Sequence, residues 1–307
     1  KVEVVATGFR LPTHIAFVPN PGPTPLDPFY YVTELHDGVK VVTRNGTVMQ
    51  YATNILNFTA SGSFSGPGEI GVSGIAVDPF NGNLFVGLMY SIGGNTGGPW
   101  TARIVKMTST DGGLTMSSMQ TIVDDAPNQY SYSHIVGQLT IGPDNKLYAA
   151  IGEGNVAAPA QNLDDFRGKI LRINLDGTAP TDNPFYTTPS AKRSFVWSYG
   201  YRNPFGSGWR SASGKNRLYV VENGPSTDRL SKSGHGHNNN WGTAGDSDGQ
   251  MFSNAIHNWS PAHAPTALAF IQQTTFGGSG FPASKMGRLY VAESGPTAGI
   301  GPWAQGK

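Results

Sequence analysis

Five copies of one short apolar pattern constrain the fold of this 307-residue chain more than any other feature. Each copy has an aromatic residue near its centre and is bounded by Gly, Pro, Asn or Asp. The central aromatics are spaced 54 to 71 residues apart, at Tyr31, Phe85, Tyr148, Tyr219 and Tyr290. Repeats of this length that hold several short strands are typical of β-propeller blades.

The strands of each repeat can be placed from the same pattern. We predict the aromatic-centred strands at 30–34, 84–88, 147–151, 218–222 and 289–293. A partner strand is predicted before each, at 15–17, 75–77, 139–141 and 268–270, with a degenerate copy around 205–209. Third strands are predicted at 39–43, 103–107 and 169–174, each followed by an Asn-Gly or Asp-Gly turn. No intervening segment has the length and period of a helix, which disfavours βαβ units.

The sequence therefore predicts an all-β fold, a six-bladed-type β-propeller of four-stranded antiparallel blades forming a single domain over 1–307. A β-sandwich is the alternative, but it would not explain units that recur with the same internal order. The fifth unit reaches Lys307 without its later strands. We expect the last part of the propeller to be missing from this chain, disordered, or supplied by another chain.

Charge and composition exclude several classes of function. The formal net charge is +1 and the longest basic run is Lys192-Arg193, so a nucleic-acid partner is not expected. No run approaches the ~18 apolar residues of a membrane span. The absence of cysteine excludes disulfides, zinc–thiolate sites and cysteine nucleophiles.

The start of the chain and its sequons bear on location. The chain begins at Lys1 without a methionine, which we interpret as a fragment or as the start of a processed protein that is secreted, periplasmic or extracellular. Asn45, Asn57 and Asn258 each begin an Asn-x-Ser/Thr sequon. They would be glycosylation acceptors in a eukaryotic secreted protein.

In a propeller the loops at one channel mouth build the site, so candidate residues should flank the inner strands. His134 precedes a predicted inner strand and has the chemistry of a general base, although a structural role is the commoner fate of a single histidine. Arg202 and Asn203 offer a donor fork and an amide suited to a flat, acidic ligand. A structural role, with the guanidinium of Arg202 stacked on Tyr199 or Tyr201, fits the spacing equally well.

Two further segments carry oxygen ligands. The backbone carbonyls of Gly224 and Pro225, with Asp228 nearby, could coordinate calcium, but the recurrence of Glu-x-Gly-Pro at 293–296 shows that blade architecture accounts for part of this pattern. Glu69 and Glu153 could bind metal or sugar hydroxyls, whereas solvated loop carboxylates are the commoner outcome.

Other chemistries find little support. The histidines at 235, 237, 257 and 263 lack a firm third ligand for a transition metal. No nucleophile elbow, phosphate loop or dinucleotide fingerprint stands in a suitable place. Serine-hydrolase and NAD-dependent activities are therefore excluded.

Six segments in this order resemble the glucose/sorbosone dehydrogenase family of soluble quinoproteins. They are 71–79, 134–154, 168–177 continuing to 185, 199–204, 222–225 and 239–242. The resemblance extends roughly from Thr7 to Trp303. It implies a six-bladed propeller that holds pyrroloquinoline quinone (PQQ) and calcium at one channel mouth.

The resemblance also implies roles for individual residues. His134 would take the proton from the sugar's anomeric hydroxyl while hydride passes to the quinone. Arg202 and Asn203 would face cofactor or substrate, and the backbone oxygens of Gly224 and Pro225 would bind calcium. Glu69 stands where the family has a cofactor-facing glutamine.

Two departures and one boundary separate the chain from the family pattern. Ser133 replaces an aspartate beside the histidine, Glu69 replaces the glutamine, and the basic residues that grip the PQQ carboxylates would lie beyond Lys307. The leading hypothesis is PQQ- and calcium-dependent oxidation of an aldose or related sugar alcohol, with an electron acceptor as second partner. The alternative is an inactive binding or structural propeller with an assembly partner or self-association. A calcium-dependent lactonase matches the motifs less well.

Overall fold

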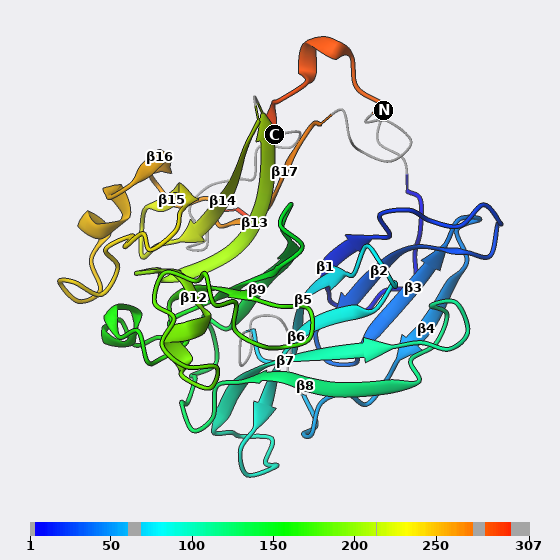
Figure 1. Ribbon diagram of the computed structural model, residues 1–307, viewed down its shortest axis with the longest axis horizontal. Coiled ribbons are helices and arrows are strands. Elements are labelled where there is room, and N and C mark those ends of the chain that lie inside the picture. The colour runs from blue at the N-terminus through cyan, green and yellow to red at the C-terminus, as the bar shows by residue number, and fades with distance from the viewer. Residues whose placement is uncertain (1–3, 61–68, 213, 273–279, 296–307) are drawn as a thin grey trace. The chain divides into compact units, whose positions relative to one another are not determined.

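The computed structural model describes residues 4–60, 69–212, 214–272 and 280–295. Their fold is all-β, with four antiparallel four-stranded sheets and one two-stranded sheet, each formed by strands consecutive in the chain (Figure 1). These sheets are propeller blades, as the sequence predicted. The helices among the described residues are four short 3₁₀ turns, η1 (Ala158–Gln161), η2 (Lys192–Phe195), η3 (Asp248–Phe252) and η4 (Ala283–Lys285). Within these residues no helix is long and apolar enough to cross a membrane.

The strands have the following bounds. The first sheet comprises β1 (Pro12–Phe17), β2 (Pro28–Glu34), β3 (Val39–Thr43) and β4 (Val48–Ala52). The second comprises β5 (Val72–Val77), β6 (Leu84–Ser91), β7 (Trp100–Thr108) and β8 (Ser118–Asp124). The third comprises β9 (Val136–Ile141), β10 (Leu147–Ile151), β11 (Lys169–Ile173) and β12 (Val196–Tyr199). The fourth comprises β13 (Asn203–Ala212), β14 (Lys215–Asn223), β15 (Asp228–Ser233) and β16 (Ala255–Trp259), and the fifth β17 (Pro265–Phe270) and β18 (Leu289–Glu293).

The predicted strands are confirmed, including all five aromatic-centred strands, now β2, β6, β10, β14 and β18. The degenerate partner around 205–209 lies within β13, the longest strand described. The fourth strand of each sheet was not located from the sequence. The predicted sixth blade and the single domain over 1–307 stay predictions.

The chain divides into two compact units, one formed by Lys1–Ile141 with Leu175–Thr178 and the other by Gly142–Asn174 with Ala179–Lys307. In the first unit β1 lies against β5, and β5 against β9. Gly74 in β5 permits this approach, because a Cβ there would lie 2.0 Å from the carbonyl oxygen of Gly137. In the second unit β13 lies against β17, where a Cβ on Gly206 would meet the backbone of Ala267 at 2.7 Å.

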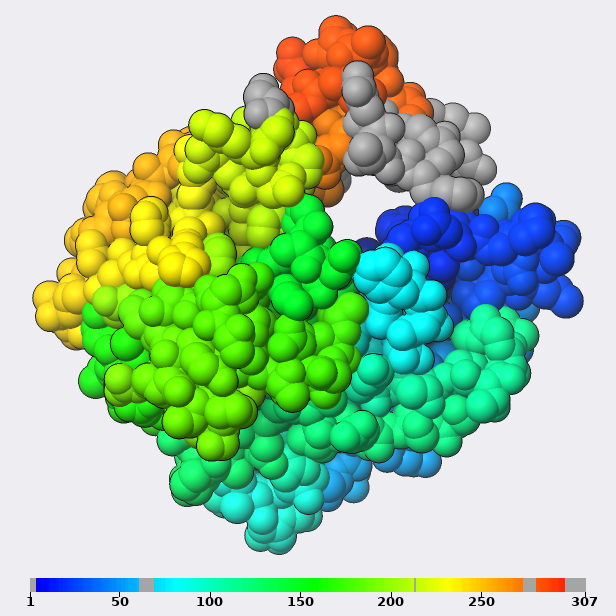
Figure 2. All heavy atoms as spheres, viewed as in Figure 1, coloured from blue at the N-terminus to red at the C-terminus, as the bar shows by residue number. Residues whose placement is uncertain are grey.

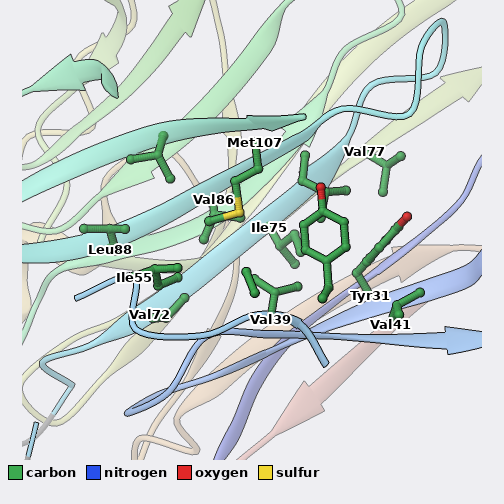
Figure 3. Close-up of a cluster of buried hydrophobic side chains, with 14 residues drawn as sticks. Tyr31, Val39, Val41, Ile55, Val72, Ile75, Val77, Val86, Leu88 and Met107 are labelled. Carbon is green, nitrogen blue, oxygen red and sulfur yellow. The ribbon is translucent and has the colours of Figure 1, made fainter. Parts of the chain in front are cut away.

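The core of the first unit lies between its first two sheets, which contact each other in the space-filling view (Figure 2). Its buried side chains are mostly β-branched and come from both sheets (Figure 3). Tyr31 joins this core, and its hydroxyl donates to the carbonyl of Gly113 at 2.8 Å. Alternating side chains of neighbouring sheets therefore share one apolar layer, the usual way for blades to bury their faces.

The entry to three first strands follows one local rule. A proline near the start of the strand pairs with a glutamate at the end of the second strand, in the pairs Pro12–Glu34, Pro204–Glu222 and Pro265–Glu293. Proline has no N–H for the ladder. In the first two cases the glutamate accepts a hydrogen bond from the backbone N–H of the residue two positions before the proline. That residue is Arg10 for Glu34 and Arg202 for Glu222. The glutamate thus fixes the residue that enters the strand.

The rule is strongest at Glu222, which is fully buried with Arg229. Oε2 of Glu222 accepts from Nη2 of Arg229 at 2.5 Å and from Nε at 3.0 Å. Nη1 of Arg229 donates to the carbonyls of Asn239, Gln250 and Ser253. A buried charge needs such a saturated set of partners, because desolvation costs several kcal/mol for each ion.

We expect Glu222→Ala to lower the free energy of unfolding by about 3–5 kcal/mol, because it leaves the Arg229 guanidinium buried without its counter-charge. Glu293 is the matched control, since it occupies the same register position but its side chain is 30% exposed. Glu293→Ala should cost less than about 1 kcal/mol. Urea unfolding measures both variants, and equal losses would contradict the assigned role of the buried pair.

Candidate functional site

His134 and Glu69 meet in the first unit. His134 lies two residues before β9, is buried, and has a φ of +57°. Its backbone N–H donates to Oε2 of Glu69 at 2.8 Å, and the N–H of Glu69 donates to the carbonyl of Tyr132 at 2.9 Å. Two bonds thus join the loop that carries Glu69 to the turn that carries His134. Left-handed backbone is uncommon outside glycine, so this turn needs such support.

The contact gives Glu69 a role that the sequence did not reveal. The carboxylate stabilises the backbone of the turn at His134, with Ser133 beside it. A glutamine at position 69 could accept the same hydrogen bond through its side-chain oxygen. The roles of Glu69 at a cofactor and of His134 as a base stay predictions.

Arg202 lies in the second unit, one residue before β13. Its backbone is held from both sides, because its N–H donates to Glu222 and its carbonyl accepts from the N–H of Glu153 at 2.8 Å. Asn203 follows as the first residue of β13, is buried, and pairs in register with Asn223. The backbone at Arg202 and Asn203 is therefore fixed before any ligand binds.

The guanidinium of Arg202 lies over an aromatic face. Its Cζ is 5.6 Å from the centroid of the Trp241 ring, and Nη1 donates to the carbonyl of Asn223 at 3.1 Å. Nε is buried and has no hydrogen-bond acceptor within the described part of the chain, while Oδ1 of Asp246 lies 3.6 Å away. The sequence left a stack on Tyr199 or Tyr201 open, but the ring beneath Arg202 belongs to Trp241.

Trp241 was noted in the sequence only as part of a family segment. Its side chain is fully buried, and its indole Nε1 donates to Oε2 of Glu153 at 2.6 Å. Ala160 and Met251 pack in the same buried cluster. Glu153 therefore holds both the backbone of Arg202 and the ring beneath its side chain.

The loop with the predicted calcium ligands Gly224 and Pro225 is shaped by two aspartates. Oδ1 of Asp228 accepts from the N–H of Gly224 at 3.0 Å, and Oδ2 accepts from the N–H groups of His263 and Ala264. Burial raises the pKa of Asp228. Both of its oxygens are thus occupied by backbone donors, so the structure assigns this side chain to the loop itself.

Asp248 holds the same loop from another side. Oδ1 accepts from the N–H groups of Ser226 and Thr227, both at 2.9 Å, and Oδ2 accepts from the Ser226 hydroxyl. Partial burial by itself would raise the pKa of Asp248, but these hydrogen bonds lower it below its usual value. The carbonyls of Gly224 and Pro225 therefore belong to a loop whose N–H groups are fixed by two carboxylates.

Three of the four histidines at 235, 237, 257 and 263 have clearly separate surroundings. His235 packs on Trp197 with ring centroids 5.2 Å apart, His257 packs on Trp259 at 4.7 Å, and Nδ1 of His263 lies 3.1 Å from Glu293. Among the described residues, no group of three or more His, Cys, Asp or Glu side chains is arranged to hold a metal ion.

The sequon asparagines differ in how their amides are used. Nδ2 of Asn57 donates to the carbonyl of Ser91 at 2.7 Å, and Nδ2 of Asn258 donates to the carbonyls of Asp228 and Met251. Oδ1 of Asn45 instead accepts from Thr43 and Thr47 in a local turn. Glycosylation at these positions stays a prediction.

The fold and these residues agree with one family. Residues 10–284 match the family model described as Glucose / Sorbosone dehydrogenase, and the chain belongs to this family. Among curated relatives, an aldose sugar dehydrogenase of Escherichia coli (strain K12) is 36% identical over 110 residues, which cover 36% of this chain and 29% of the relative. Quinoprotein glucose dehydrogenase B of Acinetobacter calcoaceticus is 35% identical over 117 residues, which cover 32% of this chain and 23% of that protein. The chain thus matches less than a third of the length of either relative.

Solved structures resemble nearly the whole chain. The PQQ-bound form of an aldose sugar dehydrogenase from Streptomyces coelicolor is 26% identical with a TM-score of 0.69. The match covers 89% of this chain and 75% of the Streptomyces coelicolor chain. The apo-form of the soluble aldose sugar dehydrogenase of Escherichia coli is 20% identical with a TM-score of 0.73, covering 96% and 89%. The second likeness concerns the fold alone.

We expect Asp248→Ala to speed hydrogen exchange at Ser226 and Thr227 by roughly 10-fold, because each amide loses an acceptor worth about 1 kcal/mol or slightly more. Asp246→Ala is the matched control, since Asp246 makes no described hydrogen bond to this loop. Exchange followed by NMR resolves the two amides. Unchanged rates in Asp248→Ala would show that the loop keeps its shape without the carboxylate.

Proposed function

We propose that this chain binds PQQ and calcium and oxidises an aldose or a related sugar alcohol. Membership of the family supports the reaction class, and the PQQ-bound relative from Streptomyces coelicolor supports the cofactor. The observation that carries the proposal is the Arg202 guanidinium, which lies over Trp241 and has a buried Nε without an acceptor among the described residues.

The residues around Arg202 fit a flat, anionic cofactor. A guanidinium presents its N–H groups as a planar fork that matches carboxylate oxygens. The side chain of Arg202 is 16% exposed, so part of the guanidinium can be reached from solvent although Nε itself is buried. A ligand carboxylate would give Nε the acceptor that it lacks, and so it would remove the cost of a buried donor without a partner.

Calcium would be held by oxygen atoms of the loop that follows β14. We propose the carbonyls of Gly224 and Pro225 as ligands, because calcium prefers oxygen donors. Pro225 has no N–H that could turn toward the cation. Asp228 and Asp248 would keep the loop in one conformation, so less ordering would be required on binding.

His134 would act as the general base. A neutral imidazole accepts a proton near neutral pH, and the sugar's anomeric hydroxyl would be its donor. Glu69 would keep the turn of His134 in place, and Asn203 would orient cofactor or substrate. PQQ, when bound, supplies the hydride acceptor that the protein itself lacks.

The reaction also requires partners outside the chain. An electron acceptor must reoxidise the cofactor after each turnover, and a small sugar must reach it. We propose an exported, periplasmic or extracellular protein, in keeping with such a substrate.

A second candidate is a family member without catalysis that serves as a binding or structural propeller. The specific observation in its favour is Ser133, which cannot supply the negative charge that an aspartate beside His134 would have. Glu69 adds a carboxylate where an anionic cofactor would be expected to favour a neutral side chain. This candidate predicts a folded protein that does not bind PQQ.

Calorimetric titration of PQQ with calcium present, followed by dye reduction with a panel of aldoses, separates the two candidates. We expect a dissociation constant of 1 μM or tighter, on the order of 8 kcal/mol of binding free energy, together with sugar-dependent turnover. A well-folded protein that takes up no PQQ would overturn the enzyme and support the binding propeller.

His134→Ala tests the assigned base. We expect turnover to fall by roughly 10²- to 10⁴-fold, the usual contribution of a general base, while PQQ affinity and the thermal midpoint stay near those of the parent protein. His257→Ala is the matched control, because His257 lies in β16, the last strand of the fourth sheet, and packs there on Trp259. Undiminished turnover in His134→Ala would exclude it as the base.

A further inference from the structure

We propose that Glu153 is a positioning residue for Arg202 and acts mainly through Trp241. The inference builds on the proposed function, in which Arg202 contacts an anionic cofactor. It gives Glu153 a role other than the metal or sugar binding that the sequence suggested, and it gives Trp241 a role for the first time. Its test uses binding and chemical labelling as well as activity.

Glu153 is placed to control the ring. It follows β10 by two residues and is 2% exposed. Its Oε2 accepts from the indole N–H of Trp241 at 2.6 Å, a short distance typical of a hydrogen bond to a charged acceptor. An indole ring has a single N–H, so this bond fixes how the ring is turned about its Cβ–Cγ bond.

The rest of Trp241 cannot move independently. Its side chain is fully buried, and its backbone N–H donates to the carbonyl of Gly200 at 3.0 Å. Its carbonyl accepts from Nε2 of Gln161. The ring is therefore a fixed surface, and the indole hydrogen bond is its polar anchor.

Arg202 depends on this surface because its own side chain is lightly held. The described hydrogen bond of the guanidinium runs from Nη1 to the carbonyl of Asn223. Asp246 lies 3.6 Å from Nε and is well exposed, so it competes for the fork. The attraction between the Arg202 guanidinium and the aromatic face of Trp241 opposes a movement of the guanidinium toward Asp246 and keeps its N–H groups available. Glu153 thus favours the conformation of Arg202 that an anionic ligand would need.

The test compares Glu153→Ala, Glu153→Gln and Trp241→Phe in the full chain. Glu153→Gln keeps a side-chain oxygen for the indole N–H, whereas the other two variants remove one partner of the bond. Asp165→Ala is the matched control, because it removes another buried carboxylate of the same unit that pairs with Arg167 instead. Thermal unfolding checks that every variant is folded.

The first readout is PQQ affinity by calorimetry. We expect Glu153→Ala and Trp241→Phe to weaken binding by on the order of 10-fold, the effect of one charge-assisted hydrogen bond. Glu153→Gln should restore most of the affinity, and Asp165→Ala should leave it unchanged. In an Arg202→Met background, Glu153→Ala should weaken binding no further. An additive loss in that double variant would show that Glu153 does not act through Arg202.

The second readout needs no cofactor. Phenylglyoxal modifies accessible guanidinium groups, and mass spectrometry of peptides gives the rate at Arg202. Arg193, whose side chain is 40% exposed and pairs with Asp164, is the internal reference. We expect the rate at Arg202 to fall several-fold, on the order of 3-fold or more, in Glu153→Ala but not in Glu153→Gln, while the rate at Arg193 is unaffected.

The two readouts separate the inference from the proposed function. If the parent protein fails to bind PQQ but labelling of Arg202 responds to Glu153→Ala, the proposed function fails and the positioning role stands. If PQQ binds and Glu153→Ala changes neither affinity nor labelling, the positioning role is overturned while the proposed function survives.

Discussion

A buried carboxylate at the end of a blade's second strand determines how the chain enters the first strand of that blade. Glu222 shows the constraint most clearly, because one oxygen holds the N–H of Arg202 and the other pairs with the fully buried Arg229. Desolvating these charges is costly unless every donor finds an acceptor. The three carbonyls around Arg229 meet that requirement. Stability and site geometry are therefore coupled, since the same carboxylate that stabilises the blade also fixes the backbone of a candidate ligand-binding residue.

The sequence predicted the parts of the blades whose side chains are buried. Four of the five aromatic-centred strands were located within a few residues because burial on both faces requires near-continuous apolar runs, as in β10, where all five residues are buried. The fifth, β18, has the same apolar run although none of its residues is buried in the structure. Two of the fourth strands, β8 and β16, escaped detection for the opposite reason. In β8 the first four residues are exposed, and β16 has no fully buried residue, so neither shows a readable alternation. The first strand β13 was recognised only as degenerate, because glycines at 206 and 208 replace the expected apolar residues where β17 packs closely.

The candidate site was predicted by residue type but not by connection. His134 with Glu69, and Arg202 with Asn203, stood out because polar groups flank inner strands. That Glu69 would bond to the backbone of the His134 turn, or that Glu153 would bind an indole, depends on contacts between residues 65 and 88 positions apart. Arg229 gave no signal either, because an arginine in a short strand is most often exposed. Such pairings require tertiary structure, which no local pattern encodes.

We propose that Arg202 and the loop at Gly224 bind a quinone cofactor with its cation. A crystal structure of the chain grown with PQQ and calcium tests it most directly. We expect quinone density with a carboxylate at the Arg202 guanidinium, and a cation bonded to the carbonyl oxygens of Gly224 and Pro225. A structure with the cofactor bound elsewhere, or with none bound at saturating concentration, would contradict it.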